Sequence, residues 1–313
     1  MNGRYRIGVA HALFAAALFG CGAPLSKLLL DRGGPGGGTL DPLILAALLY
    51  IGSGLGLLAG KGLVRLVQKT PDVPVATDEP LRGQAWFWFL FGTACSGLLA
   101  PPLLMWGLAH SAASESSLLL SLESAFTAVL AWGLFRENWN GRVILGILFV
   151  VAGAAALSFQ PGTGGFHLSW GALAVAASTL GWGIDNNCTR KIARCGAVRL
   201  AVLKGLGSGL LLLAFALTLG KSLPSPAVIA LALLLGTFSI GLCLAQMILS
   251  MRALGAARMA AWFSPAPFFG ALLSFPLLHD PLTARFLLAA GITAFGLWLH
   301  ATEGPQPPVD KAG

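Results

Sequence analysis

Charged residues are scarce in this sequence. Only 10% of the 313 residues are Asp, Glu, Lys or Arg, 56% are hydrophobic, and the mean hydropathy is +0.78. Soluble domains carry charge on about a quarter of their residues. Apolar stretches recur along the chain, most of them close to the roughly 20 residues that cross the hydrocarbon core of a bilayer. The composition therefore excludes a soluble domain and predicts an all-α membrane protein with several spans.

Cysteine pairs and catalytic motifs are also lacking. The five cysteines form no C-x-x-C pair and have no histidine at metal-ligand spacing, so we expect no metal and no cofactor. No Walker A sequence, H-E-x-x-H or G-x-S-x-G occurs, which argues against direct use of ATP and against a membrane enzyme. The net charge is +8, but no basic block is long enough to bind nucleic acid. Apart from any small solute, the expected partner of the protein is the lipid bilayer.

Ten apolar segments, separated by charges and turn residues, predict ten transmembrane helices. Their approximate limits are 7–30, 42–60, 86–108, 112–135, 142–159, 169–188, 197–219, 226–250, 256–278 and 284–300. The first segment has no signal-peptidase site and is predicted to be retained. A Gly-rich turn at 31–42 and a charged loop at 69–84 are the longest connections. Residues 303–313 are predicted to form a disordered cytoplasmic tail.

Basic residues are distributed unevenly about these spans. If the N-terminus lies in the cytoplasm, most of the 20 Lys and Arg residues fall on the cytoplasmic side, and Lys204 is counted with them. The exceptions are Lys27, Arg32, Lys221 and Arg285. Because an excess of Lys and Arg marks cytoplasmic loops, both termini are predicted to be cytoplasmic.

The two halves of the sequence resemble each other. An offset of 143 residues aligns residues 121–142 with 264–285, and an offset of 161 aligns the first span with the sixth. Each half holds five predicted spans, and this odd number makes the second half enter the membrane from the opposite side. We therefore predict two inverted five-helix repeats, residues 1–163 and 164–302. Such repeats are typical of secondary transporters; a duplicated structural bundle is the alternative.

The end of each half carries a similar sequence with one acidic residue, "LFRENWNGRVILGILFVVAGA" and "LLHDPLTARFLLAAGITAFG". This pattern resembles the EamA branch of the drug/metabolite transporter superfamily, over about residues 7–300. The second sequence departs slightly, with Asp280 where Glu is usual. The resemblance implies a multi-pass transporter of the cell inner membrane, often an exporter of amino acids, metabolites or toxic organic compounds. It carries no catalytic residue over to this chain.

Glu123 is the most unusual residue of the predicted spans. It follows Glu115 by eight residues on the fourth span, about 12 Å deeper at 1.5 Å per residue, which places it close to the bilayer centre. A charge there costs at least about 2.5–3.5 kcal/mol, so the group must face a cavity, be paired or be protonated. A carboxyl group that gains and loses a proton can couple proton entry to solute exit. The alternative is a hydrogen-bonded structural Glu.

The ninth span has an irregularity at the matching depth. The 143-residue offset sets "PAP" at 265–267 against residues 122–124, and Pro265 removes a backbone donor there. Freed carbonyls at membrane depth require protein or a wet cavity around them. Ser121, Trp262 and Ser264 lie nearby in sequence and are candidates for the same pocket. A packing kink with an ordinary buried Trp is the alternative.

Other candidate site residues are polar groups scattered over several spans. Trp182 and Asp185 are candidates for an inner gate or a solute contact, although Asp185 can equally pair with a neighbouring Arg or Lys at a helix end. Glu115 is a candidate for an outer vestibule or an ordinary interfacial acid. His11 and Gln246 are cavity candidates, with simple packing as the alternative.

Together these patterns predict a secondary active transporter that works by alternating access. We expect proton-coupled efflux of a small organic metabolite, an amino acid or a related zwitterion or cation, by a monomer or homodimer. Direction is left open by the sequence, so an uptake permease is one alternative. A non-transporting membrane sensor or scaffold is the second. An intramembrane enzyme is the third, and it requires a catalytic group that converges on Glu123.

Overall fold

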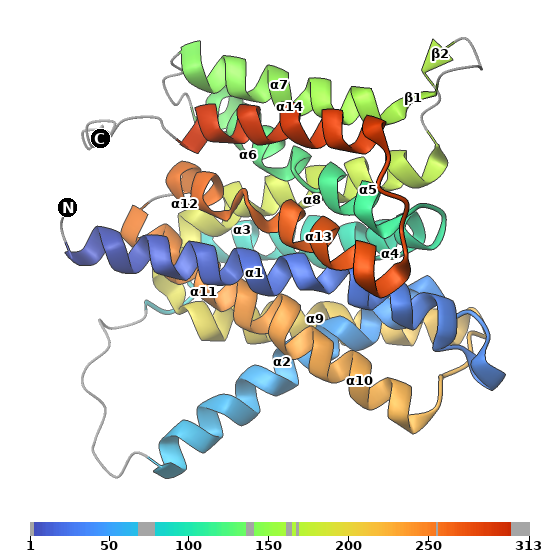
Figure 1. Ribbon diagram of the computed structural model, residues 1–313. Coiled ribbons are helices and arrows are strands. Elements are labelled where there is room, and N and C mark those ends of the chain that lie inside the picture. Colours follow the sequence, from blue (N-terminus) through green and yellow to red (C-terminus); the bar gives the residue numbers. More distant parts are fainter. Residues whose placement is uncertain are drawn as a thin grey trace.

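Apolar helices make up almost all of the structure, a computed structural model that describes residues 3–67, 79–135, 141–160, 165–166, 169–254 and 256–301. Figure 1 shows them as a bundle, with α1 crossing its middle, α7 and α14 together at one side, and α2 and α10 at the other. The predicted tail at 303–313 and residues 69–78 of the predicted charged loop lie outside the described residues.

The helices of the first half follow the predicted segments closely. They are α1 (Gly3–Arg32), η1 (Pro35–Gly37), α2 (Pro42–Val67), α3 (Gln84–Thr93), η2 (Ala94–Leu99), α4 (Ala100–Ala109), α5 (Ala113–Leu119), α6 (Leu122–Phe135) and α7 (Gly141–Ser158). Two short strands, β1 (Phe159–Gln160) and β2 (Gly165–Phe166), pair antiparallel after α7.

The second half repeats this order of elements. It contains α8 (Trp170–Ile192), η3 (Ala193–Cys195), α9 (Ala197–Thr218), α10 (Pro226–Gly236), η4 (Thr237–Leu242), α11 (Cys243–Leu254), α12 (Ala256–Phe263), α13 (Ala266–Leu278) and α14 (Ala284–Ala301). The start of α1 and the end of α14 lie on the same side of the bundle (Figure 1).

Seven helical stretches of the described chain, some of them made of two or three consecutive helices, are long and apolar enough to cross a membrane. Two shorter apolar helices accompany them, at Ile144–Leu157 within α7 and at Ala284–Leu299 within α14. The predicted fold class, an all-α membrane protein, is thus confirmed, and the short β1–β2 pair is a minor addition to it. The count of ten crossings stays a prediction.

Two predicted spans are each broken into two helices. The ninth span breaks between α12 and α13, where Pro265 cannot continue the hydrogen-bond ladder and Ser264 Oγ donates to the Ala261 carbonyl at 2.6 Å. The fourth span breaks between α5 and α6, and there the expectation of one continuous helix is wrong. Ser124 Oγ donates to the Ser121 carbonyl at 2.8 Å, and such bonds let serine compete with the helical ladder.

Two further spans contain a π-helical segment in place of an unbroken α-helix. The segment η2 joins α3 to α4, and η4 joins α10 to α11. A π-helical turn widens the helix locally and is frequent at functional sites. Both segments border a cavity at the centre of the bundle, where Ser96 of η2 and Ser239 of η4 are part of its lining.

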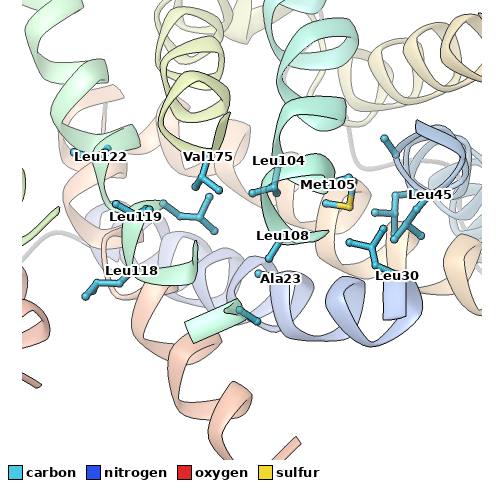
Figure 2. Close-up of a cluster of buried hydrophobic side chains, with 14 of the residues drawn as sticks. Ala23, Leu30, Leu45, Leu104, Met105, Leu108, Leu118, Leu119, Leu122 and Val175 are labelled. Atoms are coloured by element: carbon cyan, nitrogen blue, oxygen red, sulfur yellow. The ribbon is translucent and has the colours of Figure 1, made fainter. Parts of the chain in front are cut away.

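Glycines allow helices of the two halves to approach closely. A Cβ on Gly205 of α9 would meet the Tyr50 carbonyl of α2 at 2.9 Å, and one on Gly296 of α14 would meet the Gly146 carbonyl of α7 at 2.7 Å. Membrane helices associate through such small residues, because lipid is as apolar as a leucine side chain. A leucine-rich cluster of buried side chains includes residues of both halves, and Figure 2 labels members of it from α1, α2, α4, α5, α6 and α8.

Candidate functional site

A cavity of about 100 Å³ lies at the centre of the bundle, between α1, α2, α4, α8, α9 and α11. We call it the central cavity. One water occupies roughly 10–15 Å³ of such space, so the cavity has room for several waters or a small solute. Its charged and aromatic lining comes from Phe19, Tyr50, Glu123, Trp182, Asp185, Lys204 and Phe263.

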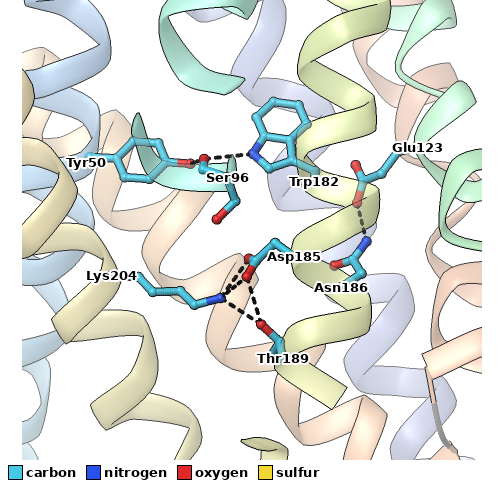
Figure 3. Close-up of polar contacts among 8 residues, drawn as sticks. All are labelled: Tyr50, Ser96, Glu123, Trp182, Asp185, Asn186, Thr189 and Lys204. Carbon is cyan, nitrogen blue, oxygen red and sulfur yellow. Dashed lines mark hydrogen bonds and ion pairs between the residues drawn. The ribbon is translucent and has the colours of Figure 1, made fainter. Parts of the chain in front are cut away.

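Glu123 lines this cavity from the first turn of α6. The residue is only 7% exposed, and its Oε1 accepts a hydrogen bond of 2.8 Å from Nδ2 of Asn186 on α8 (Figure 3). Asn186 Nδ2 also donates to Thr127 Oγ1 at 3.2 Å, which holds the amide in place. Glu123 is the second residue of α6, and its backbone N–H donates to the Leu120 carbonyl of the preceding turn at 3.0 Å.

Asp185, the neighbour of Asn186 on α8, forms a buried ion pair with Lys204 of α9. Lys204 Nζ lies 2.5 and 2.7 Å from the two carboxylate oxygens and donates to Thr189 Oγ1 at 2.7 Å (Figure 3). Asp185 is 6% and Lys204 3% exposed. Taking both charges out of water is costly, so the geometry has to be good and the remaining donors satisfied, as they are here.

Aromatic side chains form another wall of the central cavity. Tyr50 Oη and Trp182 Nε1 donate to the same acceptor, the Ser96 carbonyl in η2, at 2.7 and 3.2 Å (Figure 3). The Phe19 ring stands edge to face with Trp182, with centroids 5.5 Å apart. Since the polar ends of the tyrosine and tryptophan are bonded to backbone, these residues present mainly apolar surface to the cavity.

A second, smaller cavity of about 20 Å³ adjoins Glu123. Ser121 and Ser264, one from each broken span, line it together with Pro267 and Thr127. Glu123 lines both cavities. Pro265 itself caps the start of α13 and so creates the break against which this cavity lies.

Several predicted site residues lie apart from both cavities. Trp262 Nε1 donates to the Tyr5 hydroxyl at 3.3 Å, and His11 Nδ1 is hydrogen-bonded to Gln246 Oε1. Glu115 pairs with Arg285 of α14, with Oε1 2.6 Å from Nη2. The structure therefore brings together Glu123, Ser121, Trp182, Asp185 and Ser264, and leaves Trp262, His11, Gln246 and Glu115 outside.

Lys204 and Tyr50 also line the central cavity, and neither is among the site residues predicted from the sequence. Lys204 is counted among the cytoplasmic basic residues, and the structure shows that its side chain is buried within α9 against Asp185. The side of the membrane on which it lies stays a prediction. A lone lysine between apolar residues of a predicted span was the available signal. Asn186 is likewise a polar residue within a predicted span, directly after Asp185, and this position could have marked it as a cavity residue.

The Glu115–Arg285 pair offers a modest stability test. Glu115→Gln is expected to lower the free energy of unfolding by no more than about 1 kcal/mol, because ion pairs that water reaches contribute little. Both side chains are about one-third exposed. Thermal unfolding of the purified variant measures the effect, and a loss well above that figure would contradict the assignment to a solvated pair.

Among the residues that the structure describes, no group of three or more His, Cys, Asp or Glu side chains is placed to hold a metal ion. Ionisable residues within apolar helices of membrane proteins usually face the bundle interior or a cavity, and Glu123, Asp185 and Lys204 all line the central cavity.

Comparisons with known proteins agree with this picture. The model of the EamA-like transporter family matches residues 6–159 and 169–302. An uncharacterized transporter of Methanothermobacter thermautotrophicus is 25% identical over 307 residues, which cover 95% of this chain and 87% of that protein. A solved crystal structure is similar in fold, with a TM-score of 0.64 and 20% identity over 95% of both chains. Because the family model spans nearly the whole chain, this protein belongs to the EamA-like transporter family of the drug/metabolite transporter superfamily and is a multi-pass membrane transporter of a small solute, not an enzyme.

Proposed function

We propose that the protein is a proton-coupled secondary transporter that exports a small organic solute by alternating access. The observation that carries this proposal is Glu123, a carboxyl group only 7% exposed that lines a central cavity large enough for a solute. A carboxyl group in this position binds either a proton or a solute cation. Exchange of one for the other couples the proton gradient to solute movement.

The proposal includes ten crossings in two inverted repeats, residues 1–163 and 164–302. The offset of 143 residues maps η2 (Ala94–Leu99) onto η4 (Thr237–Leu242) end to end. It also sets the break after α5 against the break after α12, and the start of α7 at Gly141 against the start of α14 at Ala284. The two separate matches of the family model support the same division.

The two broken spans support a site that both proposed repeats share. Breaks at membrane depth create helix ends that can face a solute or ion, as in other transporters with inverted repeats. Here Glu123 stands at the start of α6 and Ser264 at the break before α13, and both line the small cavity. Rocking of one repeat against the other would open this shared region to each side of the membrane in turn.

The proposed setting is the cell inner membrane, with both termini in the cytoplasm and solute moving outward. The distribution of Lys and Arg supports the orientation. The expected solute is an amino acid or a related zwitterion or cation. The proposed oligomeric state is a monomer or a homodimer.

Transport by reconstituted protein tests the proposal. A thermal-shift screen against amino acids, organic cations and nucleosides first identifies a solute. In proteoliposomes, we expect an imposed pH gradient to drive that solute with wild-type protein, and Glu123→Gln to reduce the flux to the level without a gradient. The glutamine keeps the size of the side chain and an acceptor for Asn186, so the fold should be retained.

Glu115→Gln is the matched control, because it makes the same chemical change outside both cavities. Its gradient-driven flux should equal that of the wild type. Unchanged flux in Glu123→Gln would overturn the coupling role. Reversing the pH gradient distinguishes export from uptake, and solute binding without any flux would favour a sensor.

A further inference from the structure

The charged groups of the central cavity do not contribute equally to recognition. Within the described chain, its lining contains three such side chains: Glu123, Asp185 and Lys204. A lysine ammonium has three N–H donors. Those of Lys204 are directed to the two oxygens of Asp185 and to Thr189 Oγ1, all within 2.7 Å. Lys204 therefore has no donor left for a solute carboxylate unless the buried ion pair breaks.

Glu123 is in the opposite situation. An ionised carboxylate offers about four acceptor positions. In the described structure Asn186 Nδ2 occupies one of them, at 2.8 Å. Since Asp185 and Lys204 compensate each other, the ionised form of Glu123 leaves the cavity with one uncompensated negative charge. A cationic donor is the partner that satisfies both this charge and the free acceptor positions.

The apolar lining favours the same kind of partner. Phe19, Trp182 and Phe263 all line the cavity, and the Phe19 ring contacts the other two, with centroids 5.5 Å apart in each pair. Faces of aromatic rings attract ammonium groups and also accept apolar groups. Since the indole N–H of Trp182 is bonded to Ser96, the ring has little hydrogen-bonding capacity left for a polar solute.

We propose that the solute is an amphipathic monocation, an amine whose ammonium group binds Glu123 and whose apolar body packs against Phe19 and Trp182. This inference rests on the proposed transport function of the same cavity and narrows the solute from zwitterions and cations to cations. A solute carboxylate would meet Glu123 without a free cation to balance it. One proton then exchanges for one monocation, so the transport cycle moves no net charge.

Three probes that share a phenyl ring with a two-carbon chain and differ in their charged groups test the charge preference. They are phenethylamine, phenylalanine and 3-phenylpropionate: a cation, a zwitterion and an anion. Binding to the purified full-length protein is measured by calorimetry at neutral pH. We expect phenethylamine to bind most tightly, phenylalanine at least about tenfold more weakly, and 3-phenylpropionate not measurably, because a charge-assisted hydrogen bond is worth about a factor of ten or more.

Variants connect this preference to Glu123. Glu123→Gln should weaken phenethylamine binding at least about tenfold, Glu123→Asp should retain the order of the three probes, and Glu115→Gln should match the wild type. Lowering the pH should weaken amine binding in the wild type more than in Glu123→Gln. The other titratable groups that line the cavity are Tyr50 of α2, Asp185 of α8, Lys204 of α9 and Cys243 of α11, and they are the same in both proteins.

Each outcome decides the proposal. Tightest binding by phenylalanine or 3-phenylpropionate would overturn it, because either result requires Lys204 to leave Asp185 and bind a carboxylate. Absence of binding by all three probes would overturn it as well. If a zwitterion shows gradient-driven flux and this flux requires Glu123, the proposed solute class is wrong and the proposed transport function is retained. Flux independent of Glu123 would instead remove the transport mechanism on which the inference rests.

Discussion

Lys204→Met is expected to lower the free energy of unfolding by about 3–5 kcal/mol, the loss typical of breaking a buried ion pair from one side. Met fills much of the space of the lysine stem, so packing changes little. The variant leaves the Asp185 carboxylate, which is 6% exposed, without its cation. Gly92 of α3 packs directly against this carboxylate, so there is no room for water on that side.

The double variant Asp185→Asn/Lys204→Met separates the unpaired charge from the loss of the pair. Replacing a buried ion pair by neutral groups is often nearly neutral for stability. We therefore expect most of the loss to be recovered. Thermal or denaturant unfolding in one detergent measures both proteins. Equal stability of Lys204→Met and wild type would show that water reaches the pair, and failure of the double variant to recover would show that the pair itself holds α8 to α9.

Gly236→Ala is expected to destabilise the protein by about 1–3 kcal/mol or more, although alanine favours helices over glycine. A Cβ at this position of α10 would collide with the Leu49 carbonyl of α2. Gly52 of α2 makes the reciprocal close approach to the backbone of Leu233. Because backbone atoms cannot rotate away, the two helices have to separate. Leu49 also lines the central cavity, so solute binding should weaken together with stability.

Gly207→Ala is the matched control for this prediction. Gly207 lies within α9, and a Cβ there would meet no atom within 4 Å. The substitution should leave stability unchanged or raise it by up to about 1 kcal/mol, the difference in helix propensity. Unfolding of the two variants in parallel gives the comparison. Similar stability of Gly236→Ala and Gly207→Ala would contradict the close crossing of α2 and α10.

Helices and one central residue were predictable from the sequence. The apolar segments at 226–250 and 284–300 lie close to the observed helices, which run to Leu254 and Ala301. Glu123 was singled out because a carboxylate deep in an apolar segment is costly wherever it lies. Pro265 predicted the break of the ninth span through its missing N–H. Each of these predictions depends on the local chain alone.

The partners of the polar groups were not predictable in this way. Asp185 was considered as a partner for a nearby Arg or Lys, yet it binds Lys204, 19 residues further along and on another helix. The break between α5 and α6 has no proline, and it depends on serine bonds to backbone that a continuous helix would also permit. His11 and Gln246 were both cavity candidates, and the fold pairs them with each other instead.

By itself the sequence determined that this protein is helical, lies in a membrane and carries a carboxyl group, that of Glu123, within an apolar segment. These properties follow from the free energy of transferring each segment from water into lipid, because that free energy depends on the residues of the segment itself. Only the tertiary structure decided which charge remains uncompensated in the central cavity. That outcome depends on side chains that lie far apart in the sequence, and the packing of α6, α8 and α9 brings Asn186 to Glu123 and Lys204 to Asp185.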